Sequence, residues 1–180
     1  MSKLVEDQYV SKPFMQEEEI QLIKDSILQI ANTKDKISCF EWGSGGSTEY
    51  FVDFLSNEGF SFEWHSAEHN PEWAKKVDDK IINKKFHMHA FDYGGYTRAE
   101  TRKLCMKEYV DMPLAIDGKF DIMIVDGRKR SRCMNVAREK ISAEGVVFLH
   151  DCDREHYHSA IENFSNKLIV KRLLMAGVKA

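Results

Sequence analysis

The chain has 180 residues, of which 43% are hydrophobic and 31% are charged, and a formal net charge of -3 at pH 7. A chain of this length buries roughly 70% of its unfolded surface in one core, so we expect a single domain over residues 1–180. The charge balance gives no reason to expect nucleic-acid binding, which needs clustered Lys and Arg, and no apolar run approaches the ~18 residues that span a bilayer. We therefore expect neither a nucleic acid nor a membrane as a partner.

The N-terminus and the cysteines point to a compartment. Residues Met1 to Asp7 are too acidic and too weakly apolar for a signal peptide, so we expect a cytoplasmic protein. The cysteines form no C-x-x-C pair, which favours reduced thiols packed as small hydrophobic side chains over a zinc or redox motif. They stand at Cys39, Cys105, Cys133 and Cys152.

Hydrophobic periodicity predicts alternating helices and strands after an extended start. Residues 1–36 form a helical lead-in, in which Gln16 to Ala31 has apolar residues at helical spacing and acids in its first turn. A short apolar run from Ile37 to Trp42 stops at glycines, and a helical pattern follows from Ser47 to Asn57. This unit of strand, glycine loop and helix is then repeated, with a strand over 61–67, a helix over 71–83 and a strand over 85–90.

Two nearly unbroken apolar runs, Phe120 to Val125 and Gly145 to Leu149, are typical of central parallel strands covered on both faces. Arg132 to Ser142 can form the crossover helix between them, and Ser159 to Asn166 a further helix before Leu168 to Val170. The pattern predicts an α/β fold, a Rossmann-like open and mostly parallel sheet with helices on both faces. Because the chain ends soon after the last run, we expect the C-terminal edge of the sheet to be abbreviated.

Residues 92–119 interrupt the alternation. Tyr93 to Tyr96 has the composition of a turn, Arg98 to Tyr109 has a helical pattern, and Met112-Pro113 breaks the segment again. An insertion of this length between two strands is compatible with a lid over a substrate. A solvated loop that carries one surface helix fits the same residues equally well.

Glycines at positions 43, 45 and 46 connect the first predicted strand to its helix. Glycine lets the backbone approach a ligand closely, and the N–H groups at the start of a helix face a negative group. A nicotinamide-dinucleotide fingerprint would need a third glycine where this chain has Thr48. The loop therefore predicts a ligand site but fits that cofactor imperfectly.

Two acids at strand ends narrow the choice of ligand. Glu41 precedes the loop, where it would repel a pyrophosphate but attract the ammonium group of an amino acid. Glu68 ends the second strand 25 residues after Gly43, where an acid can accept hydrogen bonds from ribose hydroxyls. S-adenosylmethionine (SAM) carries both an amino-acid ammonium and a ribose.

The segment Phe40-Glu41-Trp42-Gly43-Ser44-Gly45-Gly46-Ser47-Thr48, followed by Ala67-Glu68, resembles the cofactor motifs of class I SAM-dependent methyltransferases. The resemblance extends over roughly residues 37 to 165. It implies that Glu41 serves the methionine amino group, the glycine loop the methionine and ribose, Glu68 the ribose and Asp92 the adenine. The implied cofactor-binding residues are Glu41, Trp42, Gly43, Ser44, Gly45, Ser47, Thr48, Glu68 and Asp92.

Polar residues follow the two central strands, at Asp126 after one and at His150-Asp151 after the other. Open α/β sheets hold ligands at this edge, and methyl transfer to a hydroxyl needs a group that removes its proton. Asp126, His150 and Asp151 are therefore the candidate catalytic residues. Capping of a turn or helix is the alternative role for each single Asp.

Together with Arg154 and Tyr157-His158, the residues after these two strands form a pattern similar to that of small methyltransferases that modify sugars and cell-surface glycans. The likeness implies O-methylation of a sugar or glycan. Arg128, Arg130 and Arg154 are the candidate residues for binding the acceptor substrate. The basic run Arg128 to Arg132 can hold an anionic group, with a solvated helix face as the alternative.

Related O-methyltransferases place a divalent metal between acids after these two strands. By that likeness Asp126, Asp151 and Asp153 are candidate ligands for Mg²⁺ or Mn²⁺. The sequence departs from the commonest metal pattern, since Arg128 stands where a second acid is often found.

Histidines occur in pairs at positions 65, 69, 87 and 89. A strand would place His87 and His89 on one face, and we interpret all four as structural residues.

The leading functional hypothesis is a SAM-dependent O-methyltransferase acting on a small hydroxyl-bearing acceptor, with a sugar or glycan favoured. A nicotinamide-dependent oxidoreductase is one alternative, since the strand, loop and helix would also suit that cofactor. A non-catalytic SAM-binding module is another, because a fold alone does not fix function.

Overall fold

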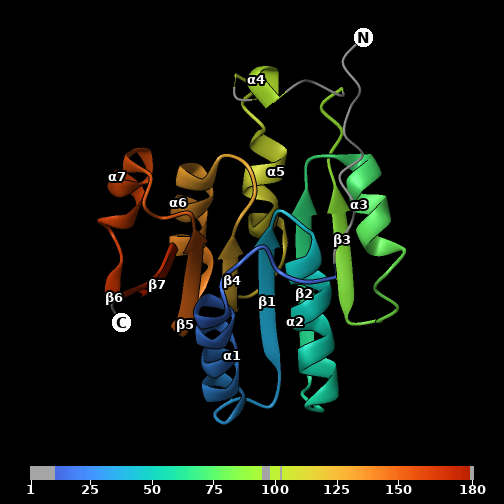
Figure 1. The fold of residues 1–180 in the computed structure, drawn as a ribbon, viewed down its shortest axis with the longest axis vertical. Helices are drawn as coiled ribbons and strands as arrows, with labels where there is room; N and C mark the ends of the chain where they lie inside the picture. Colours follow the sequence, from blue (N-terminus) through green and yellow to red (C-terminus); the bar gives the residue numbers. More distant parts are fainter. Residues whose placement is uncertain (1–10, 95–97, 102, 179–180) are drawn as a thin grey trace.

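The computed structural model describes residues 11–94, 98–101 and 103–178. Helices and strands alternate through most of this range (Figure 1). The elements are α1 (Glu17–Ala31), β1 (Ile37–Trp42), α2 (Gly46–Asn57), β2 (Phe62–Glu68), α3 (Pro71–Asp78), β3 (Phe86–Ala90), α4 (Arg98–Thr101), α5 (Lys107–Asp111), η1 (Met112–Ala115), β4 (Phe120–Val125), α6 (Arg130–Lys140), β5 (Ile141–His150), η2 (Glu155–Tyr157), α7 (His158–Ile161), β6 (Ser165–Val170) and β7 (Leu173–Gly177).

The strands form one 7-stranded sheet in the order β3-β2-β1-β4-β5-β7-β6. The pairs from β3 to β5 are parallel, and β7 runs antiparallel to both β5 and β6. The predicted Rossmann-like fold is therefore confirmed. Chain order reverses between β1 and β4, which makes the carboxyl ends of these two strands the switch point where open α/β sheets hold ligands.

The expectation of an abbreviated C-terminal edge was wrong. After α7 ends at Ile161, the chain forms the β6–β7 hairpin, in which Val170 pairs with Leu173 across the two residues Lys171 and Arg172. Lys171 takes up the positive φ of 55° that the turn requires. So tight a turn lets two strands fit into the few residues that remain, and the helix predicted to reach Asn166 stops earlier.

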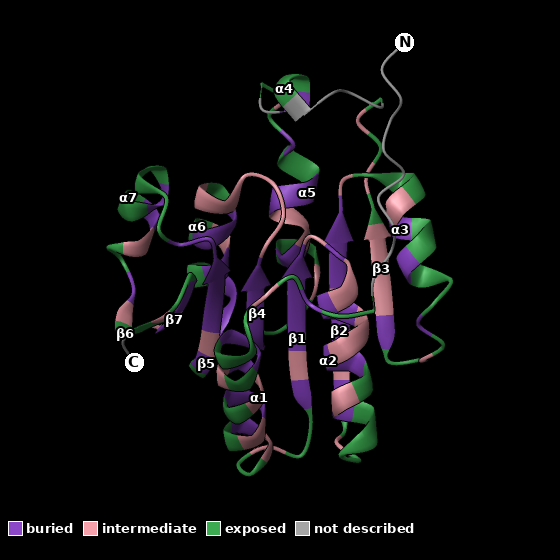
Figure 2. Cartoon of the chain, viewed as in Figure 1, coloured by how far each residue is buried: buried purple, intermediate pink, exposed green. Residues whose placement is uncertain are grey.

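Each face of the sheet has its own core, and the strand interiors are buried (Figure 2). Alternation along β4 directs Ile122 and Ile124 to one face and Met123 and Val125 to the other. The first face packs against α1, α2 and α3, and the second packs against α5, α6 and α7. Cover on both faces explains why β4 has no exposed residue.

The helix predicted from Arg98 to Tyr109 is two short helices, α4 and α5. Met106, directly before α5, has a left-handed backbone with φ of 52° and ends helical geometry there. Tyr109 and Val110 are fully or nearly fully buried in the second core. The end of the inserted segment is therefore fixed to the domain, and the lid remains a prediction.

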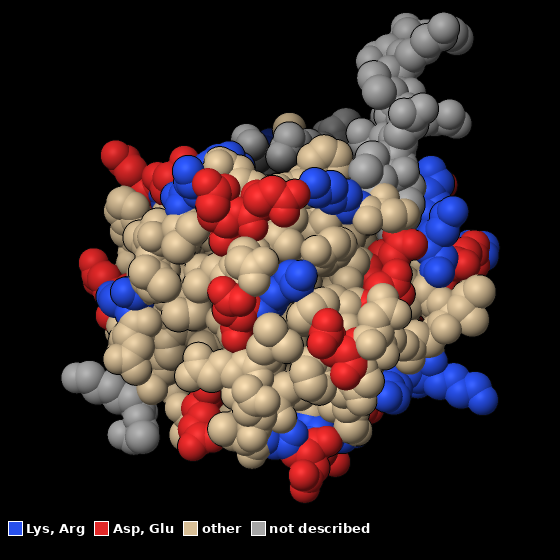
Figure 3. Space-filling view, turned by 60° about the horizontal axis from the view of Figure 1, so that its bottom comes forward, with Lys and Arg blue, Asp and Glu red and all other residues tan. Residues whose placement is uncertain are grey.

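Acidic and basic side chains are interspersed on the face that Figure 3 brings forward from the lower edge of Figure 1. That edge lies opposite the carboxyl ends of the parallel strands. Among the described residues no helix is both long and apolar enough to cross a membrane.

One buried carboxylate joins three parts of the chain near the amino end of β4. Asp121 is 5% exposed and accepts hydrogen bonds from Lys34 Nζ at 2.5 Å, the Ser38 backbone N–H at 3.0 Å and Ser142 Oγ at 2.9 Å. These bonds tie the segment before β1, β1 itself and β5 to β4. A buried acid within an apolar strand is tolerated because its lone pairs are satisfied.

We expect Asp121→Ala to lower the free energy of unfolding by about 1–3 kcal/mol, because three donors would lose their acceptor. Denaturant titration measures this loss. The matched control is Asp117→Ala at an exposed loop position, which should change stability by less than about 0.5 kcal/mol. Equal effects of the two substitutions would contradict the role given to Asp121.

Candidate functional site

A cavity of about 280 Å³ lies at the carboxyl ends of β1, β2 and β4. Its walls come from the glycine loop after β1, the β2–α3 junction and the loop after β4. Phe14 contributes from the segment before α1. The lining residues are Phe14, Gly43, Ser44, Gly45, Gly46, Ser47, Glu68, His69, Trp73, Asp126, Gly127, Arg128 and Arg130.

The floor of the cavity is a close approach of two backbones. Gly43 has a φ of 92°, and a Cβ at this position would lie 2.6 Å from Gly127 Cα. A Cβ at Gly127 would lie 1.9 Å from Tyr109 Oη and 2.9 Å from Gly43 N. Only glycine fits at either position without a shift of main chain, so the loops after β1 and β4 meet with no side chain between them.

Glu41 fastens the glycine loop from beneath instead of lining the cavity. Its Oε2 accepts a hydrogen bond from Thr48 Oγ1 at 2.6 Å, and its Oε1 accepts one from Ser47 Oγ at 2.8 Å. Thr48 Oγ1 in turn accepts the Gly45 backbone N–H at 2.8 Å. The carboxylate expected to meet a ligand ammonium is thus fully buried and engaged by hydroxyl groups.

The protonation of Glu41 responds to pH near neutrality. Burial raises its pKa to about 7, an effect opposed by the bonds from Thr48 and Ser47 and strengthened by the charge of Asp126. A native state that holds this proton while the unfolded chain releases it loses stability as pH rises from about 4.5 to about 7. The contribution of Glu41 to the stability of the folded state is therefore most favourable on the acidic side of neutrality.

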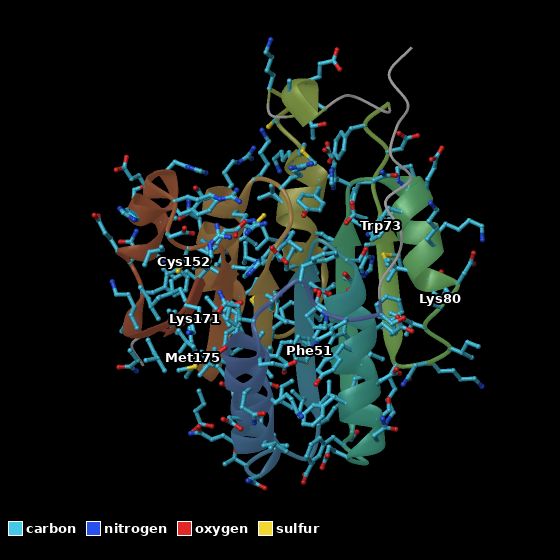
Figure 4. The ribbon with its side chains drawn as sticks, viewed as in Figure 1. Phe51, Trp73, Lys80, Cys152, Lys171 and Met175 are labelled. Carbon is cyan, nitrogen blue, oxygen red and sulfur yellow. The ribbon has the colours of Figure 1, made fainter. Side chains whose placement is uncertain are left out.

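Glu68 holds the second wall of the cavity. Its Oε2 accepts the Ser44 backbone N–H at 3.1 Å, and its Oε1 accepts the N–H groups of His69 and Asn70 at 2.8 and 2.9 Å. Trp73 Nε1 donates to the Ser44 carbonyl oxygen at 2.8 Å, and Trp73 lies on α3 near the edge where β2 ends (Figure 4). The glycine loop is bound to both the β2 end and α3.

Ser44 leaves one polar atom unsatisfied at this position. Its Oγ is buried and has no hydrogen-bond partner among the described residues, although Ser44 lines the cavity. Buried hydroxyl groups are nearly always paired, so this atom is suited to a ligand that enters the cavity.

Besides Glu41 and Thr48, two more residues expected to bind the cofactor, Trp42 and Asp92, do not line this cavity. Trp42 is fully buried in the second core, where its Nε1 donates to the Tyr109 carbonyl oxygen at 3.1 Å. Strand alternation at the end of β1 turns the indole into the helical layer, away from the loop that follows. Asp92 is exposed, and its Oδ1 accepts the Gly94 N–H at 2.8 Å, as in a local turn.

Arg130 joins the ends of β4 and β5. Its guanidinium donates to the carbonyl oxygens of Gly127, Asp126 and His150 at 3.0, 2.7 and 2.5 Å. Its side chain is only 11% exposed, and Nη2 lies 2.8 Å from Asp126 Oδ1. Arg130, predicted to bind the acceptor substrate, is therefore already engaged in hydrogen bonds that hold these strand ends together. It also lines the cavity.

Of the three candidate catalytic residues, only Asp126 lines the cavity. Its Oδ1 lies 3.1 Å from His150 Nδ1. Burial lowers the pKa of His150, but the hydrogen bond and charge of Asp126, with the charges of Asp151 and Glu19, raise it overall above 6.5. Because His150 Nδ1 is engaged by Asp126 and His150 does not line the cavity, His150 is a positioning partner of Asp126.

The metal set predicted from the sequence does not form. Asp151 is bound by three guanidinium groups, from Arg130 at 3.4 Å, Arg172 at 2.8 Å and Arg154. Asp153 is exposed and bound by Arg172 Nε at 3.2 Å. Because arginine charges already neutralise both carboxylates, these residues do not fit Mg²⁺ or Mn²⁺.

A second cavity, of about 540 Å³, lies next to the first, and we call it the basic cleft. The two share Gly127, Arg128 and Arg130. The basic cleft is lined by Gly127, Arg128, Lys129, Arg130, Ser131, Arg132, Arg154, His156 and Tyr157. None of these described residues is acidic. The basic run Arg128 to Arg132 therefore lines a concave surface that carries positive charge.

Sequence reasoning did not assign Phe14, His69 or Trp73 to the site. His69 follows Glu68 directly, its Nδ1 lies 2.6 Å from Glu68 Oε1, and its Nε2 lies 3.3 Å from Arg128 Nε. A histidine beside the acid at a strand end was the available signal. Phe14 is 83% exposed and follows Pro13 in the lead-in, where no pattern marks it.

No protein-family model and no curated protein matches the sequence. Solved structures do match, including a methyltransferase-like protein from Silicibacter pomeroyi at 18% identity and a TM-score of 0.63, over 94% of this chain and 90% of that one. A ribosomal protein L11 methylase from Lactobacillus delbrueckii subsp. bulgaricus matches at 12% identity and a TM-score of 0.54, over 94% and 82%.

A third match is the MycE methyltransferase of the mycinamycin biosynthetic pathway, solved in complex with Mg, SAH and mycinamycin VI. Its identity is 11% and its TM-score 0.56, over 90% of this chain and 46% of that one. At these identities the comparisons show a shared fold.

The coupling between Asp126 and His150 is measurable by NMR titration of the histidine ring. We expect the pKa of His150 to lie above 6.5 in the wild type and to fall in Asp126→Asn, because burial then acts with less opposing charge. The protonated ring stabilises the fold below pH 6.5, and this contribution is lost as pH rises through the folded pKa. An unchanged titration in Asp126→Asn would refute the pairing, and His158, which is exposed, serves as reference.

Proposed function

We propose that this protein is a SAM-dependent O-methyltransferase. The observation that carries the proposal is the cavity at the β1–β4 switch point, with the glycine loop on one side and the Glu68 carboxylate on the other. Such a cavity offers backbone N–H groups to a carboxylate and a carboxylate to hydroxyl groups. The fold is shared with several structures described as methyltransferases.

The residues present fit this cofactor. Ser44 presents an unsatisfied buried hydroxyl, and the N-terminal residues of α2, Gly46 and Ser47, face the cavity. Glu68 would hold the ribose, and Trp73 would form an apolar wall. When bound, SAM supplies an activated methyl group for transfer to a nucleophile.

Thr48 favours this reading over a nicotinamide cofactor. The position that a dinucleotide fingerprint gives to glycine is occupied by a side chain that bridges the Gly45 N–H and the Glu41 carboxyl. Hydrogen bonds of Thr48 and Glu41 therefore hold the conformation of the loop. A catalytic role, as opposed to cofactor binding alone, is supported by Asp126, which lines the same cavity.

The acceptor would enter through the basic cleft, which shares Arg128 with the cofactor cavity. Asp126 would receive the hydroxyl proton, while Arg130 and His150 hold its carboxylate in place. Five cationic residues line the cleft, so we propose a sugar or glycan acceptor that carries a phosphate or carboxylate.

Cofactor binding is tested by calorimetric titration with S-adenosylhomocysteine. The wild type should bind one equivalent, and Glu68→Ala should weaken binding at least about tenfold, since the ribose acceptor and the anchor of Ser44 are both lost. Glu72→Ala, at an exposed position of α3, is the control and should bind like the wild type. No binding by the wild type, or preferential binding of NADH, would refute the proposal.

The acceptor class is tested by methyl transfer to hexose phosphates and to unphosphorylated hexoses. We expect transfer to phosphorylated sugars, and Arg132→Ala should raise KM about tenfold with little change in kcat, because a group that binds the anion is lost. Lys167→Ala on β6 is the charge-matched control. Equal use of both sugar classes, with no effect of Arg132→Ala, would contradict an anionic acceptor.

A further inference from the structure

Four polar side chains meet on the sheet face opposite α2 and α3. Glu63 and His65 alternate on β2, while His87 and His89 alternate on β3. The parallel register pairs His65 with His87, and Ala67 with His89. Sequence alone gave these histidines a structural role with no ligand pair nearby, but the register brings an acid and three imidazoles together.

Three possible ligand atoms of this group lie close together, two of them on the stacked rings of His65 and His87, whose centroids are 4.6 Å apart. Glu63 Oε1 lies 3.5 Å from His65 Nε2 and 3.3 Å from His87 Nε2, and the three atoms all lie within 4.8 Å of one another. Zinc bonds of about 2.0–2.1 Å in tetrahedral geometry separate neighbouring ligand atoms by about 3.3–3.4 Å. The two distances to Glu63 are therefore already close to those of a zinc site.

Two further atoms of these side chains, His65 Nδ1 and Glu63 Oε2, are held by outer partners. His65 Nδ1 and His89 Nε2 lie 3.0 Å apart, at hydrogen-bond distance, which orients the His65 ring and directs its Nε2 toward Glu63. Lys36 Nζ lies 2.5 Å from Glu63 Oε2 and leaves Oε1 toward the histidines. A ligating histidine that hydrogen-bonds through its other nitrogen is the usual arrangement in metal sites.

We propose that Glu63, His65 and His87 form a zinc site that joins the edge strand β3 to β2. Two imidazoles and one carboxylate suit Zn²⁺, and the same three-ligand set leaves a fourth position for water. The His65 side chain is 11% exposed, whereas those of Glu63 and His87 are 36% and 41% exposed, so an ion can enter from solvent. The site lies apart from the cofactor cavity and shares no residue with it.

The site would act on the least supported strand of the parallel sheet. β3 has 5 residues and, within the part of the chain that the structure describes, pairs with β2 alone. An ion bound to Glu63 and His65 on one side and to His87 on the other crosses this single pairing. Zinc binding would therefore stabilise the β2–β3 pair, and this stabilisation would not require bound SAM.

The experiment is titration of the full chain, freed of metal by chelation, with ZnCl₂ by calorimetry and thermal shift. We expect one equivalent to bind and to raise Tm, with Co²⁺ giving the visible absorption of a tetrahedral site. His87→Ala and Glu63→Gln should each lower affinity at least about tenfold, and His89→Ala should weaken it through loss of the outer partner. Circular dichroism checks that each variant is folded.

Exposed His158 on α7 provides the matched control, and His158→Ala should bind zinc like the wild type. Absence of one-equivalent binding by the wild type would overturn the proposal. So would unchanged affinity in both His87→Ala and Glu63→Gln, or loss of binding in His158→Ala. None of these outcomes depends on cofactor binding, so the zinc site and the methyltransferase proposal fail or stand separately.

Discussion

The backbone contact between Gly43 and Gly127 is the constraint on which the carboxyl edge of the sheet depends. β1 and β4 flank the point where strand order reverses, and the loops after them meet there without side chains. Gly127 belongs to both the cofactor cavity and the basic cleft, so the two hollows share this junction. Glu41 then secures one loop from below through Thr48, while Arg130 secures the other through three carbonyl oxygens.

Arginine side chains neutralise the acids at this edge. Asp151 has a left-handed backbone, with φ of 55°, which directs its carboxylate into a group of three guanidinium groups. Asp126 is held by Arg130 and His150 and is also one of the residues that line the cavity. The fold sets where a ligand lies, and the side chains decide how charge is balanced there.

Sequence patterns predicted the central sheet well, because β1 and β4 are apolar runs bounded by polar residues and glycine. Both strands begin and end at the residues predicted. The β6–β7 hairpin was missed because its turn, Lys171-Arg172, contains none of the glycine or asparagine that marks tight turns. Glu41 was correctly predicted to lie at the end of the first strand. Its hydrogen bonds to Ser47 and Thr48 depend on the direction of its side chain, which the sequence pattern does not give. Likewise, Arg172 reaches Asp151 only through the hairpin that sequence could not reveal.

The irregular end of β6 has a consequence for association between molecules. β6 is the outer strand of the sheet and carries exposed Leu168 and Ile169, which are 45% and 60% exposed. An open apolar strand of this kind is a template on which another chain can add. Here the register shifts between Ser165 and Leu168, and Asn166 has a φ of 51°. This irregularity interrupts the row of outward N–H and C=O groups and so shortens the straight segment on which another strand could pair.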